Sequence, residues 1–138
     1  MPESIEQFIT EFIAAWNAHD IDRVTSCYCP EYEEEDVAQP TPASGRDDLR
    51  RRVAYYLRAF PDLRVSLDDV VVEGNRIVLF WTWHGTHQAT FMRIPPTGRT
   101  VAVRGTSLIH LEDGKIRRAL RVWDLAGLLR GIGLLPEL

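Results

Sequence analysis

The sequence lacks most of the residues on which covalent catalysis or a disulfide-stapled fold would depend. Only two of its 138 residues are cysteines. Cys27 and Cys29 are too close together for a favourable disulfide bond, and two cysteines are too few for a disulfide scaffold, so a reducing cytoplasm suits the chain best. Every basic residue except Lys115 is an arginine. Schiff-base catalysis would therefore have to depend on that one lysine.

Membrane spans and cofactor-binding motifs are also missing from the sequence. No apolar run approaches the roughly 20 residues that a membrane-spanning helix requires. The sequence contains no G-x-S-x-G nucleophile elbow, no phosphate-binding loop and no dinucleotide glycine motif. We therefore expect no organic cofactor. Any chemistry is expected to be acid–base chemistry by a few side chains in an apolar cavity.

The charge of the chain argues against a nucleic-acid partner. The formal net charge is -4, and the 16 basic residues are scattered along the sequence instead of forming a dense patch. Binding to a phosphate backbone normally needs such a patch. A composition of 45% apolar and 26% charged residues is typical of a folded protein, and the length predicts a single domain over residues 1–138.

Helices are predicted in the first part of the chain. Ser4 and Gln7 have the spacing of a capping box, and the apolar residues from Ile5 to Trp16 recur at helical intervals. Asp20 can cap a short second helix. A third helix is expected to end at Pro61, with apolar residues from 49 to 60 on one face. The acidic and then Pro-, Ser- and Thr-rich stretch 31–45 is predicted to be a loop that holds at most a short strand.

After Pro61 the apolar period changes from that of a helix to that of a strand. The predicted strands are Val65–Glu73, Arg76–His87, Thr100–Leu111 and Ile116–Trp123, and a short helix over Leu125–Leu135 is predicted to follow them. Helices followed by an antiparallel meander indicate an α+β fold. Helices laid across the concave face of a strongly curved antiparallel sheet would enclose a cone-shaped pocket for a small molecule, although a flat open sheet also fits this order.

Metal binding is not expected. His84 and His87 have a spacing that would pair them on a helix, but on a strand they point to opposite faces. The acidic run 31–36 is interpreted as a solvated loop face. The sequence therefore predicts no metal site.

Aromatic residues are the candidates for the wall of a cavity. Trp16, Tyr28, Tyr32 and Trp81 carry polar groups that need partners when buried, whereas packing in an ordinary core is the alternative. Asp124 ends the last predicted strand on an apolar face. Partial desolvation there would raise its pKa toward that of a useful base. Equally, Asp124 could simply be the N-cap of the last helix.

Several short motifs follow one another in a characteristic order: Ala15–Asp20, Ala59–Leu63, Gly85–His87, Ile94–Arg99 and Asp113–Ile116, with Asp124 after them. By the order and spacing of these motifs, the chain resembles the SnoaL-like polyketide cyclases of the NTF2-like superfamily. The resemblance implies a cone-shaped α+β barrel that works without metal or cofactor. It also implies an oligomer. The segment Ile77–Trp81 is apolar on both faces of its predicted strand, and this surplus apolar surface predicts a homodimer or a higher even oligomer.

The resemblance also implies a reaction and a set of site residues. The aspartate matching Asp124 is the general acid/base of an intramolecular aldol ring closure of a polyketide ester. A glutamine and a histidine of the family are matched here by Gly105 and Ser107, so Ser107 is expected to contact substrate and His87 is the candidate hydrogen-bond donor in their place. The same fold serves hydroxylases, epoxide hydrolases, dehydratases and isomerases, and a non-catalytic small-molecule-binding dimerisation module is a further alternative.

Overall fold

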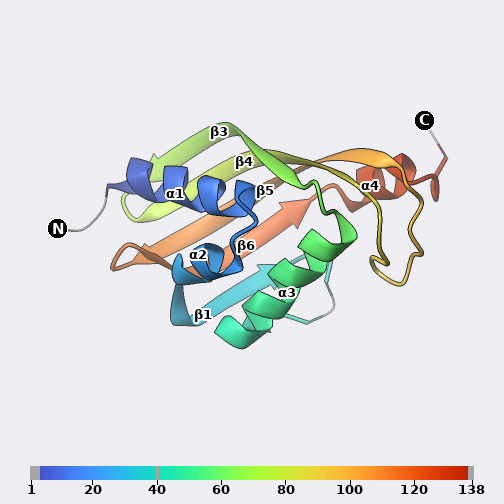
Figure 1. Ribbon diagram of the computed structural model, residues 1–138. Coiled ribbons are helices and arrows are strands. Elements are labelled where there is room, and N and C mark those ends of the chain that lie inside the picture. Colours follow the sequence, from blue (N-terminus) through green and yellow to red (C-terminus); the bar gives the residue numbers. More distant parts are fainter. Residues whose placement is uncertain (1–3, 40, 137–138) are drawn as a thin grey trace.

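The structure is a computed structural model that describes residues 4–39 and 41–136 (Figure 1). It contains four helices, namely α1 (Ile5–Asn17), α2 (Ile21–Ser26), α3 (Arg46–Ala59) and α4 (Leu125–Gly131). The strands are β1 (Tyr28–Asp36), β2 (Ala43–Ser44), β3 (Arg64–Glu73), β4 (Arg76–Thr86), β5 (Thr100–Glu112) and β6 (Lys115–Trp123). The predicted α+β class is confirmed. None of the helices in the described part of the chain is long and apolar enough to cross a membrane.

The helix ends follow the predicted signals. Ser4 and Gln7 form both hydrogen bonds of the capping box at the start of α1. At the start of α2, the side chain of Asp20 accepts a hydrogen bond from the backbone N–H of Arg23. α3 ends at Ala59, two residues before Pro61, as expected for a residue that cannot continue a helix.

The six strands form one mixed sheet in the order β2-β1-β6-β5-β4-β3. β1 runs parallel to β6, and every other neighbouring pair is antiparallel. The sheet curls but does not close, because its edge strands β2 and β3 do not pair. Helices α1, α2 and α3 lie on one side of it (Figure 1). This arrangement confirms the curved sheet, with a single parallel pair that the sequence did not predict.

The loop predicted over residues 31–45 is wrong in its first part, since β1 continues to Asp36. Along this strand Tyr32, Glu34 and Asp36 are buried, while Glu33 and Glu35 are exposed. The alternation is that of a half-buried strand, but two of the inward residues are acids. A hydropathy pattern cannot distinguish such a strand from a solvated acidic loop.

Candidate functional site

A pocket with a volume of about 80 Å³ opens between the concave face of the sheet and helices α1 and α3. Most of its wall is apolar or aromatic. The lining residues are Phe12, Ile13, Trp16, Tyr28, Glu34, Tyr56, Leu63, Val65, Leu79, Trp81, Trp83, Ser107, Ile109, Ala119, Arg121 and Trp123. The few polar groups among them come mainly from β1, β5 and β6. An apolar pocket with a small number of convergent polar groups is the usual form of a small-molecule site.

Arg121 is held in the pocket wall by the buried carboxylate of Asp36. Its Nε and Nη2 groups donate to Oδ2 of Asp36 at 3.3 and 3.0 Å. The other oxygen, Oδ1, accepts from the indole Nε1 of Trp123 and from the backbone N–H of Ala38, both at 2.9 Å. The Asp36 carboxylate is thus fully hydrogen-bonded. It fixes the position of two residues that line the pocket, Arg121 and Trp123.

The guanidinium of Arg121 stays charged despite its burial. Burial alone would lower the pKa of this group, but the carboxylates of Glu34 and Asp36 and the hydroxyl of Tyr56 raise it above its ordinary value. The guanidinium carbon also lies 5.6 Å from the centroid of the Tyr56 ring, in a cation–π contact. The pocket therefore contains a permanent cation at a fixed place.

Glu34 is the second charged residue of the pocket wall, and its side chain has no hydrogen-bond partner within the described residues. The residue is only 7% exposed and lines the pocket. No direct ion pair joins it to Arg121 within that part of the chain, where Arg121 pairs with Asp36 instead. Glu34 is therefore an acceptor that is free to meet a ligand, close to a fixed cation.

Two tyrosines add hydrogen-bonding hydroxyls to the wall. Burial, followed by the nearby Glu34 carboxylate, raises the pKa of Tyr28 well above its ordinary value. Burial also raises the pKa of Tyr56, against the opposing effect of Arg121. Both phenols consequently remain protonated at neutral pH and can donate hydrogen bonds to an oxygen in the pocket.

Four of the residues predicted to contact substrate lie in this wall, namely Trp16, Tyr28, Trp81 and Ser107. The indole Nε1 of Trp81 donates to Oγ of Ser107 at 3.0 Å. Tyr32 is not among the lining residues. It is fully buried behind the wall, where its ring makes an edge contact with the ring of Tyr28 at 4.9 Å.

Asp124 lies outside the pocket, and the expectation that it is desolvated is wrong. Its side chain is exposed and accepts a hydrogen bond from the backbone N–H of Gly127 at 2.8 Å, as the N-cap of α4. The reason is the parity of β6: Arg121 and Trp123 point into the pocket, while Val122 points outward and is exposed. The apolar face that carries Asp124 is the outer face of the sheet.

His87, the predicted donor, does not line the pocket either. It follows β4, is completely buried and lies beside the ring of Phe60. Its Nδ1 accepts from the backbone N–H of Thr97 at 3.2 Å and also lies 3.0 Å from the hydroxyl of that residue. These contacts fasten the loop between β4 and β5, which is a structural role.

The functional side chains that sequence reasoning missed are Glu34, Asp36, Tyr56 and Arg121. Tyr56 belongs to the apolar face predicted for the third helix, which gives no reason to place it in a site. For the two acids and the arginine, the available signal was the alternation of β1 and β6, with Tyr32 and Trp123 marking the inward face. That alternation places Glu34, Asp36 and Arg121 on the same side as buried aromatic rings.

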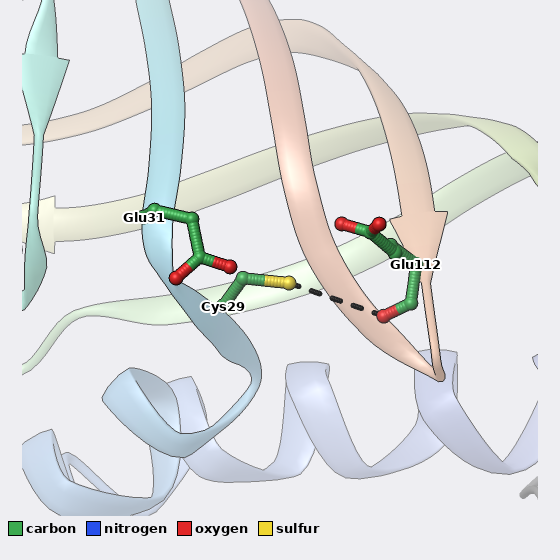
Figure 2. Close-up of side chains that lie close together, drawn as sticks. All are labelled: Cys29, Glu31 and Glu112. Atoms are coloured by element: carbon green, nitrogen blue, oxygen red, sulfur yellow. Dashed lines mark hydrogen bonds between the residues drawn. The ribbon is translucent and has the colours of Figure 1, made fainter.

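One group of potential metal ligands exists within the described residues, and it lies away from the pocket (Figure 2). It consists of Cys29, Glu31 and Glu112. Burial, followed by these two carboxylates, raises the pKa of the Cys29 thiol, and the thiol lies 3.9 Å from the backbone carbonyl of Glu112 as a donor. A cysteine binds a metal as the thiolate, so a raised pKa of the Cys29 thiol works against coordination. Both acids are exposed, and Glu112 pairs with Arg117.

Comparison with solved structures gives close matches over nearly the whole chain. TsrD from Streptomyces laurentii is 30% identical, with a TM-score of 0.85, over 95% of this chain and 96% of that one. AclR from Streptomyces galilaeus is 28% identical, also with a TM-score of 0.85, over 96% of this chain and 87% of that one. IdmH from Streptomyces antibioticus shares the fold at 22% identity and a TM-score of 0.81, over 95% and 99% of the two chains.

The family comparison covers the same region. No match is found among curated proteins. The model of the SnoaL-like polyketide cyclases matches residues 6–132, which include every helix and strand except the first residue of α1. By this match, the chain belongs to the SnoaL-like polyketide cyclase family.

Proposed function

We propose that the protein catalyses the intramolecular ring closure of a small, hydrophobic, polyketide-like ester by acid–base chemistry in this pocket, with Glu34 as the general base. One observation carries the proposal: a buried carboxylate without a hydrogen-bond partner lines the same pocket as a fixed guanidinium. A base and a charge stabiliser are the two groups that formation of an enolate requires.

The reaction begins with transfer of a proton from the acidic carbon beside the ester carbonyl to Glu34. The electron pair of the broken C–H bond becomes the enolate, and the N–H groups of Arg121 that Asp36 does not use stabilise its oxygen. The enolate carbon then attacks a ketone carbonyl of the same molecule and forms the new C–C bond. The resulting alkoxide takes a proton back from Glu34, so the product is an isomer of the substrate and no co-reactant is consumed.

Tyr28 supports the second half of this reaction. Because its pKa is raised, its hydroxyl is protonated and can donate a hydrogen bond to the carbonyl under attack. Arg121 needs no proton transfer in either half. Its raised pKa keeps it cationic throughout, and its ion pair with Asp36 holds the guanidinium in place.

A second candidate reaction is hydroxylation, because AclR is described as a proposed hydroxylase. Hydroxylation of an acidic carbon can start from the same enolate, so the first step would be shared. Both candidates therefore predict that the protein accelerates proton exchange at such a carbon. A purely binding module predicts no acceleration.

The test uses methyl 1-oxoindane-2-carboxylate, a planar keto ester, in mildly acidic D2O. Deuterium incorporation at the carbon between the two carbonyls is followed by NMR with wild type, Glu34→Gln and Asp124→Asn. We expect wild type to exceed the buffer rate and Glu34→Gln to lose about 100-fold of the enzymatic rate, the usual contribution of a positioned base.

The two carboxylate variants are matched, because each replaces one acid by its amide. Loss of exchange in Asp124→Asn with full activity in Glu34→Gln would return the role of base to Asp124. A wild-type rate equal to that of buffer would contradict an enolising activity on this ester. Circular dichroism of each variant verifies that it is folded.

A further inference from the structure

The indole of Trp81 lies across the inner face of the sheet, where it contacts two residues of β5. In the β4–β5 ladder Trp81 pairs directly with Gly105. A Cβ atom added to Gly105 would lie 2.6 Å from Cζ2 of Trp81 and closer still to Cη2, distances that real atoms do not tolerate. The six-membered ring of the indole therefore lies in the space that any other residue at position 105 would fill with its side chain.

Ser107 provides the second anchor. It is two residues further along the same face of β5, and its Oγ accepts the hydrogen bond from the indole Nε1 of Trp81. The buried indole N–H thus has its partner, while the neighbouring Cζ2–Cη2 edge of the ring lies above Gly105. The indole cannot change rotamer without losing the hydrogen bond to Ser107 and its close packing on the backbone at Gly105.

Trp81 also lines the pocket, and so does Ser107. We propose that Trp81, Gly105 and Ser107 form a size-selecting unit. In this unit the indole is an immobile wall that limits how large a ring system the pocket admits. The small pocket volume, about 80 Å³, agrees with a wall that intrudes into the space between the sheet and α1.

The size preference of the pocket is therefore set by residues of the sheet and not by residues of the helices. A ligand that is too large cannot displace Trp81, because Gly105 and Ser107 hold it, whereas Phe12 and Trp16 are carried by α1 alone. The inference uses the proposed function only in taking this pocket as the substrate site. It is tested by binding without turnover.

The experiment measures dissociation constants by isothermal titration calorimetry for two phenols of different size, 2-naphthol and 1-hydroxypyrene. Wild type is expected to bind 2-naphthol more tightly. Trp81→Leu should shift the ratio of the two affinities by about tenfold or more toward 1-hydroxypyrene, the scale on which a pocket discriminates by size. Trp81→Phe, which keeps one ring and is less disruptive to folding, should shift the ratio in the same direction by a smaller factor.

A double-mutant cycle tests whether Gly105 acts on the affinity ratio through Trp81. Gly105→Ala should change the affinity ratio in the wild-type background, because the new methyl group displaces the indole. The same change should have a smaller effect in the Trp81→Leu background, where the only close contact left to the new methyl group among those at Gly105 is Cβ of Trp123 at 2.8 Å. The matched control is Gly85→Ala on β4, whose Cβ would lie 2.9 Å from Cβ of Phe60, a residue outside the pocket wall. It should lower stability without changing the ratio.

The proposal is overturned if the affinity ratio is unchanged in both Trp81 variants, or if Gly105→Ala has the same effect with and without the indole. These outcomes are independent of catalysis. A protein that fails the deuterium-exchange test can still show size selection by Trp81, and an active enzyme can lack it.

Discussion

At the scale of single residues, Asp36 is notable because its carboxylate accepts four hydrogen bonds. Its carboxylate is buried, and all four of its hydrogen bonds come from groups that shape the pocket wall or the end of β1. An asparagine in its place would keep the volume but would point an NH2 group at the N–H donors of Arg121 or Trp123. The cationic Arg121 would also lose its ion-pair partner.

We therefore expect Asp36→Asn to lower the free energy of unfolding by about 3 kcal/mol, the cost of breaking a buried ion pair by removal of one partner. Urea unfolding followed by tryptophan fluorescence measures the change. Asp36→Asn combined with Arg121→Gln should recover only the part of the loss that comes from the unpaired guanidinium, because the second substitution also removes the cation beside the buried Glu34 carboxylate. A loss below about 1 kcal/mol in the single variant would mean that Glu34 takes over the pairing with Arg121.

The residue scale is also where prediction from the sequence succeeded least. Asp124 stood out because it follows an apolar alternation, yet Val122 and Asp124 belong to the outer face of the sheet. Glu34 did not stand out, because it lies within a run of acids in which Glu31, Glu33 and Glu35 are exposed. A strand pattern gives two faces but does not say which one is covered. The cover here comes from helices α1 and α3, whose positions depend on tertiary packing.

At the scale of elements, the predicted helices and the four long strands were confirmed within a few residues. The ends of these elements are set by residues close to them in sequence, namely the capping residues, Pro61 and the Asp113–Gly114 turn. β1 could not be predicted in the same way. Its inward face carries Glu34 and Asp36, and such acids are stable there only because Arg121 of β6 lies next to them in the parallel pair. That neighbour is 85 residues from Asp36 along the chain.

Asp62 lies between α3 and β3 and connects this junction to the end of β4. Its carboxylate accepts hydrogen bonds from the hydroxyl and the backbone N–H of Thr86, both at 2.7 Å. These bonds lower the pKa of Asp62. Because the folded-state pKa lies below the unfolded one, the stabilisation is present above the unfolded-state pKa and is lost as the pH falls through the folded-state pKa.

Asp62→Asn should therefore be less stable than wild type at neutral pH, and the difference should shrink as the medium becomes acidic. Thermal unfolding midpoints of the two proteins over a series of buffers measure this difference. Thr86→Val, which removes the hydroxyl but keeps the backbone N–H, should show the same trend with a smaller amplitude. A difference that does not change with pH would assign the effect to packing instead of to the charge of Asp62.

At the scale of the whole molecule, the outer face of the sheet carries apolar side chains that the described residues leave uncovered. Its cross-strand ladder places apolar side chains next to one another on four strands, β3 to β6. We call this the outer apolar patch, and it consists of Val71, Val78, Phe80, Leu108, Leu120 and Val122. Phe80 is 36% exposed and Val71 53%. Contiguous exposed apolar surface of this kind usually marks an interface.

The occupant we expect is a second copy of the chain, packed through the outer apolar patch about a two-fold axis, as in most homodimers. Light scattering after gel filtration should give about twice the chain mass of 15.8 kDa for wild type. Phe80→Arg should give the monomer mass, because a guanidinium at the centre of a self-complementary patch faces its own copy across the axis. Val72→Arg is the matched control. Val72 is about as exposed as its neighbour Val71, but it pairs with the buried Ile77 and so lies on the opposite side of the sheet. Its replacement should leave the dimer intact. A wild-type mass equal to one chain across micromolar concentrations would contradict the dimer, and loss of the dimer in Val72→Arg alone would move the interface to the concave side of β3.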